Sequence, residues 1–439
     1  MLPTSHAADI TAPGRRFGVG GTGMPGVMAL DRGPLWDDTA GMALDGYSWL
    51  PALRRRSRGA AVETRVMGRR AVGLRGPDAV RFFYDERHVR RHGAIPEPVQ
   101  GTLFGHGAIH TLDGDRHRLR KAMFLSLLTG PERVASLVDR VAVAWEEAVA
   151  SWSDRPVVMF DEAARVITGG ACDWAGVPVD KADVPALARD LTAMVDGFAT
   201  PGPRHWRARR ARGRLERRLE ALIDHIRAGT ATAAAGSALE AVSRQPDVDG
   251  VLLDSRRAAV ELLNVLRPTV AVAWFVAFTG HALHRWPEHR ERLREEDPAY
   301  AVAFANEVRR FYPFAPFVGG RAVDDLTWRG VRIPAGSLVL LDIFGQNHDS
   351  ELWPQPYRFD PERFLGRLPD PDVLIPQGGG DRATGHRCPG EDVTLALMAG
   401  FATWLARLSY AVPPQDLTIS LRRIPALPRS RFVVTPLND

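Results

Sequence analysis

The sequence predicts a mainly α-helical fold with a minor β region, built as one domain of a chain of 439 residues. Two observations carry this prediction. Hydrophobic residues recur at helical spacing through most of the chain after residue 76, whereas stretches that alternate in the manner of strands are few and short. The composition, 45% hydrophobic and 25% charged, is that of an ordinary globular protein. We therefore expect one large helical core with a small sheet beside it.

The N-terminal segment 1–27 differs from the rest of the chain, because it is rich in Gly, Pro, Ser and Thr and shows no hydrophobic period. We expect residues 1–27 to form a mobile arm and residues 28–439 to form the folded domain. The arm contains the run 18–23, GVGGTG, which formally matches a dinucleotide-binding pattern. That pattern requires a preceding strand and a following helix, and the arm offers neither, so we do not interpret the run as a nucleotide site.

The predicted elements follow in chain order. Alternation in 62–66 and 71–74 predicts two strands joined by a turn. Helical periodicity predicts helices over 77–84, 115–128, 131–152, 161–175, 184–198, 204–228, 255–284 and 299–311, and a last long helix after Pro389. Further strands are expected at 326–328, 337–341, 417–421 and 432–434, and a loop rich in Pro, Asp and Gly over 349–382.

The net charge of +5 comes almost wholly from arginine and says little about partners. In the densest basic stretch, 204–218, Leu215 and Leu219 recur at helical spacing, as does Leu222 just beyond it. This pattern favours the solvated face of an amphipathic helix over a surface for nucleic acid or a redox partner. We expect no nucleic-acid partner.

Cysteine usage and hydropathy bear on the compartment. Cys172 and Cys388 are the two cysteines, too few for a disulfide framework, and the N-terminus shows no secretory signal pattern. The longest apolar run, near 270–279, is shorter than the roughly 20 residues that span a bilayer. We expect a cytoplasmic protein without a membrane anchor.

The strongest local motif is the segment 376–390, PQGGGDRATGHRCPG, a glycine-rich loop that delivers Cys388 to the start of a helix. Backbone amides at a helix N-terminus favour an anionic sulfur, so this position predicts a lowered thiol pKa. Glycines let the backbone approach a flat cofactor without side-chain collision. A buried structural cysteine would leave the loop unexplained, and no strand-turn-helix nucleophile motif surrounds Cys388. A thiolate ligand to haem iron is the interpretation that fits best.

Two further motifs lie upstream. Glu307 and Arg310 share one face of a predicted helix, and Arg363 lies in the segment 359–364, FDPERF. With Cys388, and in this order, they resemble the Glu-x-x-Arg helix, the Pro-Glu-Arg-Phe loop and the haem loop of the cytochrome P-450 superfamily. The resemblance implies the cytochrome P-450 fold as a single haem-binding domain, a haem b whose iron Cys388 ligates, and a buried structural network of the other three residues.

The sequence departs from that superfamily at two places. Asp381 stands where the loop usually has phenylalanine, and Arg267-Pro268 stands where the long central helix usually carries an acid-threonine pair that delivers protons. A buried arginine is costly unless paired, and a mid-helix proline kinks a helix at a cost of about 3 kcal/mol. With the triple-glycine loop and the segment 307–314, EVRRFYPF, this Arg-Pro step resembles the bacterial fatty-acid peroxygenase branch. The similarity runs from about residue 28 to the end.

This resemblance implies oxidation of a long-chain fatty acid by hydrogen peroxide near the carboxyl group, giving α- or β-hydroxy acids or terminal alkenes. Arg267 would hold the carboxylate through two charge-assisted hydrogen bonds. The carboxylate would take and return a proton as the O–O bond breaks, which replaces the missing acid-threonine relay. Fatty acid and hydrogen peroxide are then the expected partners, with no obligatory redox partner.

The same resemblance implies further site residues. His110 matches a position near the haem that is associated with product choice; otherwise it is a hydrogen-bonded structural histidine. Phe104 and Phe314 are expected to line the pocket or to belong to the core. The candidates for binding the haem propionates are, first, His386 and Arg321, and then His117, Lys121 and Arg120.

Two alternatives stay open on the sequence. A conventional haem-thiolate monooxygenase would take electrons from a reductase docked on the basic surface, although Arg267 weighs against this. A non-catalytic haem sensor or carrier would need the Cys388 loop but no carboxylate clamp.

Overall fold

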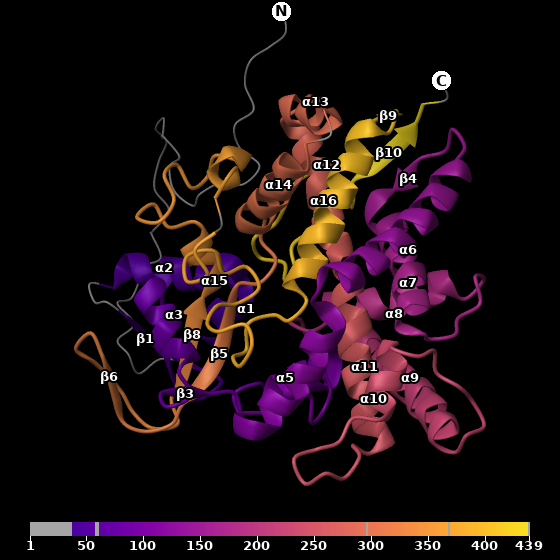
Figure 1. The fold of residues 1–439 in the computed structure, drawn as a ribbon. Helices are drawn as coiled ribbons and strands as arrows, with labels where there is room; N and C mark the ends of the chain where they lie inside the picture. Colours follow the sequence, from indigo (N-terminus) through magenta and orange to yellow (C-terminus); the bar gives the residue numbers. More distant parts are fainter. Residues whose placement is uncertain (1–36, 58–60, 296, 368, 438–439) are drawn as a thin grey trace, which may run out of the picture.

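The computed structural model describes residues 37–57, 61–295, 297–367 and 369–437. A large bundle of helices packs beside a smaller region that contains the main sheet, at lower left in Figure 1. The mainly α fold with a minor β region is confirmed. The predicted arm 1–27 and its glycine run lie outside the described residues.

The helices lie close to their predicted positions. The predicted ones are α3 (Pro77–Tyr84), α5 (Gly114–Leu128), α6 (Pro131–Ala150), α7 (Met159–Ala175), α8 (Val184–Asp196), α9 (Pro203–Arg227), α11 (Ser255–Val270), α12 (Val272–Arg285), α14 (Pro298–Phe311) and α16 (Glu391–Arg407). The sequence reasoning missed α1 (Thr39–Asp45), α2 (Trp49–Arg56), α4 (Glu97–Val99), α10 (Ala238–Ser243), α13 (Glu288–Arg294) and α15 (Ile343–Asn347). Short helical turns are η1 (Gly46–Ser48), η2 (Gln100–Phe104), η3 (Ile109–Thr111) and η4 (Pro361–Phe364).

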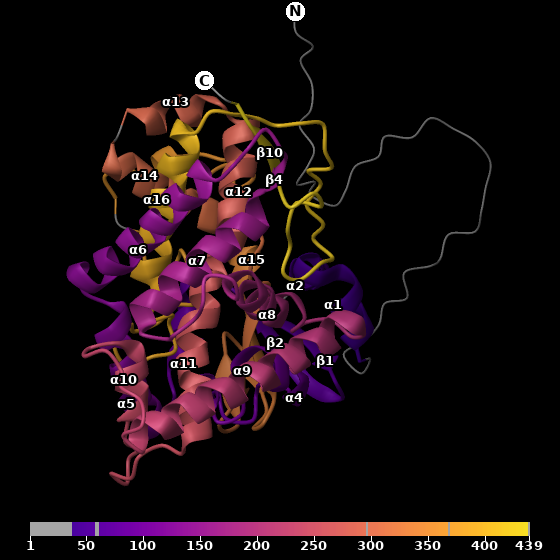
Figure 2. The ribbon, with the colours of Figure 1, turned by 90° about the vertical axis from the view of Figure 1, so that its right-hand side faces the viewer.

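The main sheet has the strand order β1-β2-β8-β5-β3. Strand β2 pairs antiparallel with β1 and parallel with β8, where Ala71 lies opposite Leu338. A second sheet joins β4, β10 and β9 at the upper end of the bundle in Figure 2, and β6 pairs with β7. The strands are β1 (Val62–Val66), β2 (Arg69–Leu74), β3 (Val89–Arg90), β4 (Val157–Val158), β5 (Phe317–Ala322), β6 (Leu326–Trp328), β7 (Val331–Ile333), β8 (Leu338–Asp342), β9 (Tyr410–Ala411) and β10 (Val433–Pro436).

Strand β8 is buried along its whole length because both faces of the sheet are covered. Leu338 and Leu340 cluster with Trp49 of α2. Val339 and Leu341 point the other way and cluster with residues of α3. A strand covered on both faces reads as a continuous hydrophobic run, as this one does.

The centre of the bundle is the pair α11–α12, which is buried almost without interruption from Ala258 to Leu283. A helix that is apolar all round belongs in a protein core or in a membrane. The combined segment Ser255–Arg285 is long and apolar enough to cross a membrane by length and composition, yet 94% of its apolar window is buried inside the protein. The sequence reasoning counted only the shorter run 270–279 and so missed this feature.

The segment predicted as one helix, 255–284, forms the two helices α11 and α12, and the break between them does not fall at Pro268. Helix α11 continues to Val270, and the break lies at Ala271, whose N–H donates to the Arg267 carbonyl at 3.0 Å. The ring nitrogen of Pro268 carries no hydrogen, so the carbonyl of Asn264, four residues earlier, receives no helical bond from it.

One strand prediction was wrong, and β3, β4, β5, β7 and β9 were not predicted. The segment 417–421 forms only an isolated bridge, between Ile419 and Pro428. Strand β5 was missed because Gly319 and Gly320 weaken its strand pattern. Gly320 is required by packing, since a Cβ there would lie 2.3 Å from the Val89 side chain of the neighbouring strand β3.

Candidate active site

Cys388 lies near the end of a loop that leads into α16. Its backbone N–H donates to the Gln377 carbonyl at 3.2 Å, and the Gln377 side-chain amide lies 3.7 Å from the sulfur as a donor. The same amide donates to the Thr394 hydroxyl at 3.0 Å, in the first turns of α16. The sulfur therefore has a fixed position and a hydrogen-bond donor supplied by its own loop.

Two glycines of this loop have left-handed backbone conformations, Gly378 with φ +90° and Gly380 with φ +78°. A Cβ on Gly378 would lie 2.6 Å from the Tyr84 hydroxyl, and one on Gly380 would lie 2.6 Å from the Tyr84 Cβ. Tyr84 ends α3, so these glycines let the loop pack against the sheet region. This packing role adds to the cofactor approach inferred from the sequence.

The predicted lowering of the Cys388 pKa was wrong. Burial raises the pKa of this thiol, and the opposing Gly390 N–H and Lys121 ammonium do not compensate. Helix α16 begins only at Glu391, so the sulfur does not sit directly on the helix N-terminus. A metal cation at the sulfur would supply the missing stabilisation of the thiolate.

Arg309, which the sequence reasoning passed over, braces this loop. Its buried guanidinium donates to Gln377 Oε1 at 2.6 Å, to Glu391 Oε1 at 3.0 Å and to Asn306 Oδ1 at 2.8 Å. It thus joins α14, the loop and α16. The doubled arginine of EVRR was the available signal, because neighbouring helical residues point about 100° apart and the two arginines must have different partners.

Glu307, Arg310 and Arg363 come together as predicted. Arg310 and Glu307 form a bidentate pair with both distances at 2.7 Å, and both side chains are 0% exposed. Arg363 Nε lies 3.7 Å from Glu307 Oε1, and the Asp360 N–H donates to the same oxygen at 2.8 Å. Arg310 also donates to the Asn347 carbonyl at 2.8 Å. The network ties α14 to the 349–382 segment and has a structural role.

Arg267 is a buried guanidinium, 5% exposed, with no carboxylate partner among the described residues. Nη2 donates to Asn264 Oδ1 at 3.2 Å, and Nε has no hydrogen-bond partner. The guanidinium carbon lies 5.7 Å from the centre of the Phe104 ring. Burial, and then the charge of Arg212, lowers the pKa of Arg267 to about 9, whereas Cys388 raises it. Arg267 and Cys388 are therefore within electrostatic reach of each other.

His110 completes this group. Its ring centre lies 4.2 Å from that of Phe104, and its buried Nδ1 has no hydrogen-bond partner. Burial, and then the Arg267 charge, lowers its pKa well below the ordinary value, so the imidazole is neutral at pH 7. Phe314 is half-buried and packs on α12, with its ring centre 4.8 Å from that of Phe275.

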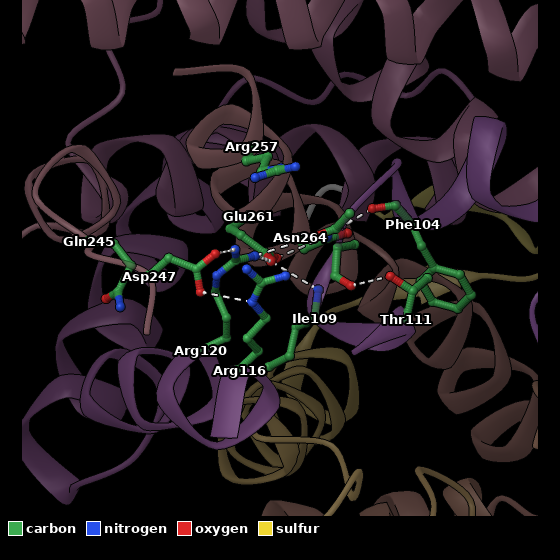
Figure 3. Close-up of polar contacts among 12 residues, drawn as sticks. Phe104, Ile109, Thr111, Arg116, Arg120, Gln245, Asp247, Arg257, Glu261 and Asn264 are labelled. Carbon is green, nitrogen blue, oxygen red and sulfur yellow. Dashed lines mark hydrogen bonds and ion pairs between the residues drawn. The ribbon is translucent and has the colours of Figure 1, made fainter. Parts of the chain in front are cut away.

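A further acid, Glu261, anchors these residues and was also missed (Figure 3). Fully buried on α11, it accepts hydrogen bonds from Arg120 at 2.5 Å, from the Ile109 N–H at 2.9 Å and from the Asn264 amide at 3.4 Å. Asn264 in turn donates to the Phe104 carbonyl at 2.9 Å. Glu261, Asn264 and Arg267 are spaced three residues apart on one helical face, and this spacing was the signal that could have revealed their hydrogen-bonded series.

The expected propionate ligands divide into two groups. His117 and His386 stack with ring centres 3.8 Å apart, and buried nitrogens of both, like the Nε of Arg321, have no hydrogen-bond partner. Lys121 instead donates to the loop carbonyls of Gly385, at 2.9 Å, and Arg387. Arg120 points to Glu261 and lies 3.8 Å from Asp247. The structure gives these two cations partners other than those expected.

The arrangement fits a haem on three counts. Cys388 is presented by a braced loop, whereas Cys172 is buried in α7, where burial raises its pKa to about 12. His117 Nδ1 and Arg321 Nε have no hydrogen-bond partner and could serve carboxylates, whereas His386 Nε2 faces Asp113 Oδ1 at 3.7 Å. Arg267 and His110 gather within electrostatic reach of one another and, in the case of Arg267, of Cys388.

Comparison with known proteins agrees with this geometry. The family model of cytochrome P450 matches residues 282–429. Abscisic acid 8'-hydroxylase 3 of Oryza sativa is 27% identical over 80% of this chain and 75% of its own length. A solved structure of a cytochrome P450SP alpha variant is 41% identical, with a TM-score of 0.88, covering 91% of this chain and 98% of its own.

Two solved structures with bound fatty acids are similarly close. Cytochrome P450EX alpha with myristic acid is 36% identical, with a TM-score of 0.87, covering 91% of this chain and 96% of its own. A variant of cytochrome P450 OleT with arachidonic acid is 36% identical, with a TM-score of 0.87, covering 92% and 97%. The chain therefore belongs to the cytochrome P450 superfamily and, within it, to the CYP152 branch of fatty-acid peroxygenases, which use a cysteine-ligated haem b.

Proposed function

We propose that this protein oxidises long-chain fatty acids near the carboxyl group with hydrogen peroxide. The observation that carries the proposal is Arg267, a buried cation without a carboxylate partner among the described residues. Burying an unpaired charge costs several kcal/mol, and an anionic ligand would remove that cost. The similar structures that hold myristic acid and arachidonic acid support a fatty acid as this ligand.

In this proposal Cys388 is the iron ligand, and His386, Arg321 and His117 bind the propionates. A haem held there supplies the redox chemistry that splits the peroxide O–O bond. For hydroxylation, RCH2COOH and H2O2 give RCH(OH)COOH and H2O. For decarboxylation, RCH2CH2COOH and H2O2 give RCH=CH2, CO2 and two H2O.

Arg267 orients the substrate head first. Its Nη and Nε groups can donate two parallel hydrogen bonds to a carboxylate, which fixes the α and β carbons nearest the guanidinium. Pro268, the next residue, has no hydroxyl or acid with which to move a proton. The bound carboxylate therefore takes a proton from the peroxide and returns it to the departing oxygen, as a general base and then a general acid.

In this proposal His110 influences which product forms, as a neutral hydrogen-bonding group beside the Arg267 guanidinium. Its ring packs against that of Phe104 at an interplanar angle of 31°, and its Nδ1 has no hydrogen-bond partner, so this nitrogen is available to a ligand. Holding the substrate chain or a water through this nitrogen would shift the balance between hydroxylation and decarboxylation.

The proposal also covers binding partners and the cellular compartment. Peroxide supplies both the oxygen atom and the oxidising equivalents, so no redox partner is needed, and we propose a cytoplasmic enzyme that binds no nucleic acid. Both cysteines are free, which suits a reducing compartment.

The test is turnover by the purified holoprotein with hydrogen peroxide and saturated fatty acids of several chain lengths, without any reductase. We expect hydroxy acids or alkenes in the product mass spectra. Strict dependence on a reductase and NAD(P)H would instead favour the conventional monooxygenase, and binding without turnover under either condition would favour a sensor.

A further inference from the structure

A second buried arginine, Arg212, lies close to Arg267 but on a different helix. It is on α9 and is 2% exposed. Among neighbouring charges, that of Arg212 has the largest effect on the Arg267 pKa, which it lowers, and it also lowers the pKa of His110. Arg212 lies in the basic stretch 204–218, for which the sequence predicted a solvated helix face, and its burial is an exception to that prediction.

Arg212 holds the backbone segment that carries Phe104. Its Nη1 donates to the Leu103 carbonyl at 3.3 Å. A Cβ on Gly105, where φ is +87°, would lie 2.5 Å from Arg212 Nη2, so only glycine lets the chain lie this close. Since the Phe104 ring contacts both His110 and the Arg267 guanidinium, the position of this segment sets the position of both groups.

The charge of Arg212 is only partly neutralised. Its Nε lies 3.0 Å from Glu216 Oε1, while the other oxygen of Glu216 faces Arg256 at 3.3 Å. One carboxylate thus serves two guanidinium groups. The Nη2 of Arg212 is buried and has no hydrogen-bond partner. Glu261 also stabilises the Arg212 charge, but it is already paired with Arg120, so with Arg267 the region carries more positive than negative charge before a substrate binds.

We propose that Arg212 is a positioning and selectivity residue for the substrate carboxylate. It fixes the Leu103–Gly105 segment against Arg267, and its charge favours an acid over a neutral ester of the same chain. This inference rests on the proposed function. The physical reason is that two like charges in a poorly solvated region repel each other, and a carboxylate between or beside them is attracted by both.

The test compares binding of myristic acid and methyl myristate to the holoprotein, by the shift of the haem absorption band. We expect Arg212→Gln to weaken binding of the acid about tenfold and to leave the ester almost unchanged. Arg212→Lys keeps the charge and should retain most of the preference for the acid. The matched control is Arg214→Gln, which removes an exposed arginine of the same helix, paired with Asp190 at 2.6 Å, and should change neither affinity.

A second variant, expected to tighten acid binding, separates the effect of charge from a folding defect. Glu216→Gln removes the counter-charge of Arg212, so acid binding should become tighter, about threefold, and ester binding should not. Equal loss of acid and ester binding in Arg212→Gln, or unchanged acid binding in a variant with a normal carbon monoxide spectrum, would overturn the inference while leaving the proposed function intact. Wild-type protein that prefers the ester would overturn both.

Discussion

The side chain of Asn264 joins the guanidinium of Arg267 to the backbone of Phe104. Its oxygen accepts a hydrogen bond from Arg267 Nη2 at 3.2 Å, and its amide donates to the Phe104 carbonyl at 2.9 Å. Glu261, one turn earlier, holds Asn264 and the N–H of Ile109, next to His110. The residues proposed to bind and orient the substrate therefore share one set of supports on α11.

Replacing Arg267 by alanine should remove fatty-acid binding and peroxide-driven turnover. The loss of a charge-assisted bidentate contact corresponds to about 3 kcal/mol or more, roughly a hundredfold or greater in affinity. Arg267→Lys keeps the charge but loses the two parallel hydrogen bonds of the guanidinium. Its affinity for the acid should lie between those of the wild type and Arg267→Ala. Spectral titration with myristic acid measures this, and unchanged affinity in Arg267→Ala would contradict the proposed function.

Asn264→Asp should act as an internal competitor of the substrate. A carboxylate at this position would lie where the Asn264 oxygen now is, 3.2 Å from Arg267 Nη2, and would neutralise the guanidinium. We expect acid affinity to fall about tenfold and stability to fall as well, because the second carboxylate oxygen would face the Phe104 carbonyl and Glu261, which now accept hydrogen bonds from the Asn264 amide. The same titration, with a urea unfolding curve, measures both quantities; a variant that binds acid as tightly as wild type would show that Arg267 does not hold the carboxylate.

His110→Gln should change the ratio of alkene to hydroxy acid without abolishing turnover. In the wild type this ratio should stay constant between about pH 6 and about pH 8, because the lowered pKa keeps the imidazole neutral throughout that window. Gas chromatography of products at several pH values checks both statements. A ratio that followed a titration near pH 6.5 would indicate an imidazole that protonates in this range.

Glu307→Gln should destabilise the protein by about 3–5 kcal/mol, because it leaves Arg310 buried without its counter-charge. The matched control is Glu291→Gln, which breaks the pair of Glu291 and Arg294, also three residues apart and at 3.0 Å but with 71% and 42% of the side chains exposed. Its effect should be under about 1 kcal/mol. Urea unfolding of the two variants gives the comparison, and similar losses would show that burial does not matter here.

The buried carboxyl of Asp342 should make stability depend on pH. Burial raises its pKa to about 6 from 3.8, although its Oδ1 accepts a hydrogen bond from the Gly345 N–H at 2.8 Å. The folded state then holds the proton more tightly than the unfolded state. The resulting stabilisation is complete below pH 3.8 and is lost as the pH rises through about 6.

Asp342→Asn removes this titration and keeps an acceptor for Gly345. Relative to the variant, wild type should lose up to about 3 kcal/mol between about pH 4 and about pH 7. Unfolding midpoints of both proteins across this range measure the difference, in which contributions from other groups cancel. A constant difference would mean that Asp342 does not titrate there.

Much of the fold could be predicted from local patterns. Helical periodicity located α3, α6 and α8 to within two residues, because each presents one apolar face or stripe to the core. Strand β5 was not predicted, because Gly319 and Gly320 carry no side chains that would show a strand pattern. Side chains of neighbouring strands pack against these glycines instead. Such a strand is defined by its partners, which the local sequence does not contain.

What the sequence by itself determined was the chemistry: Cys388 in its glycine-rich loop, the Glu307–Arg310 pair, and Arg267 followed by Pro268. Only the tertiary structure decided which partners each charge has. In the folded protein Arg120 forms an ion pair with Glu261, and burial raises the pKa of Cys388. Arg212, on another helix, lies close enough to Arg267 to lower its pKa. The physical reason is that burial and Coulomb interactions depend on distance in space, and α9 and α11 carry these arginines 55 positions apart in the chain.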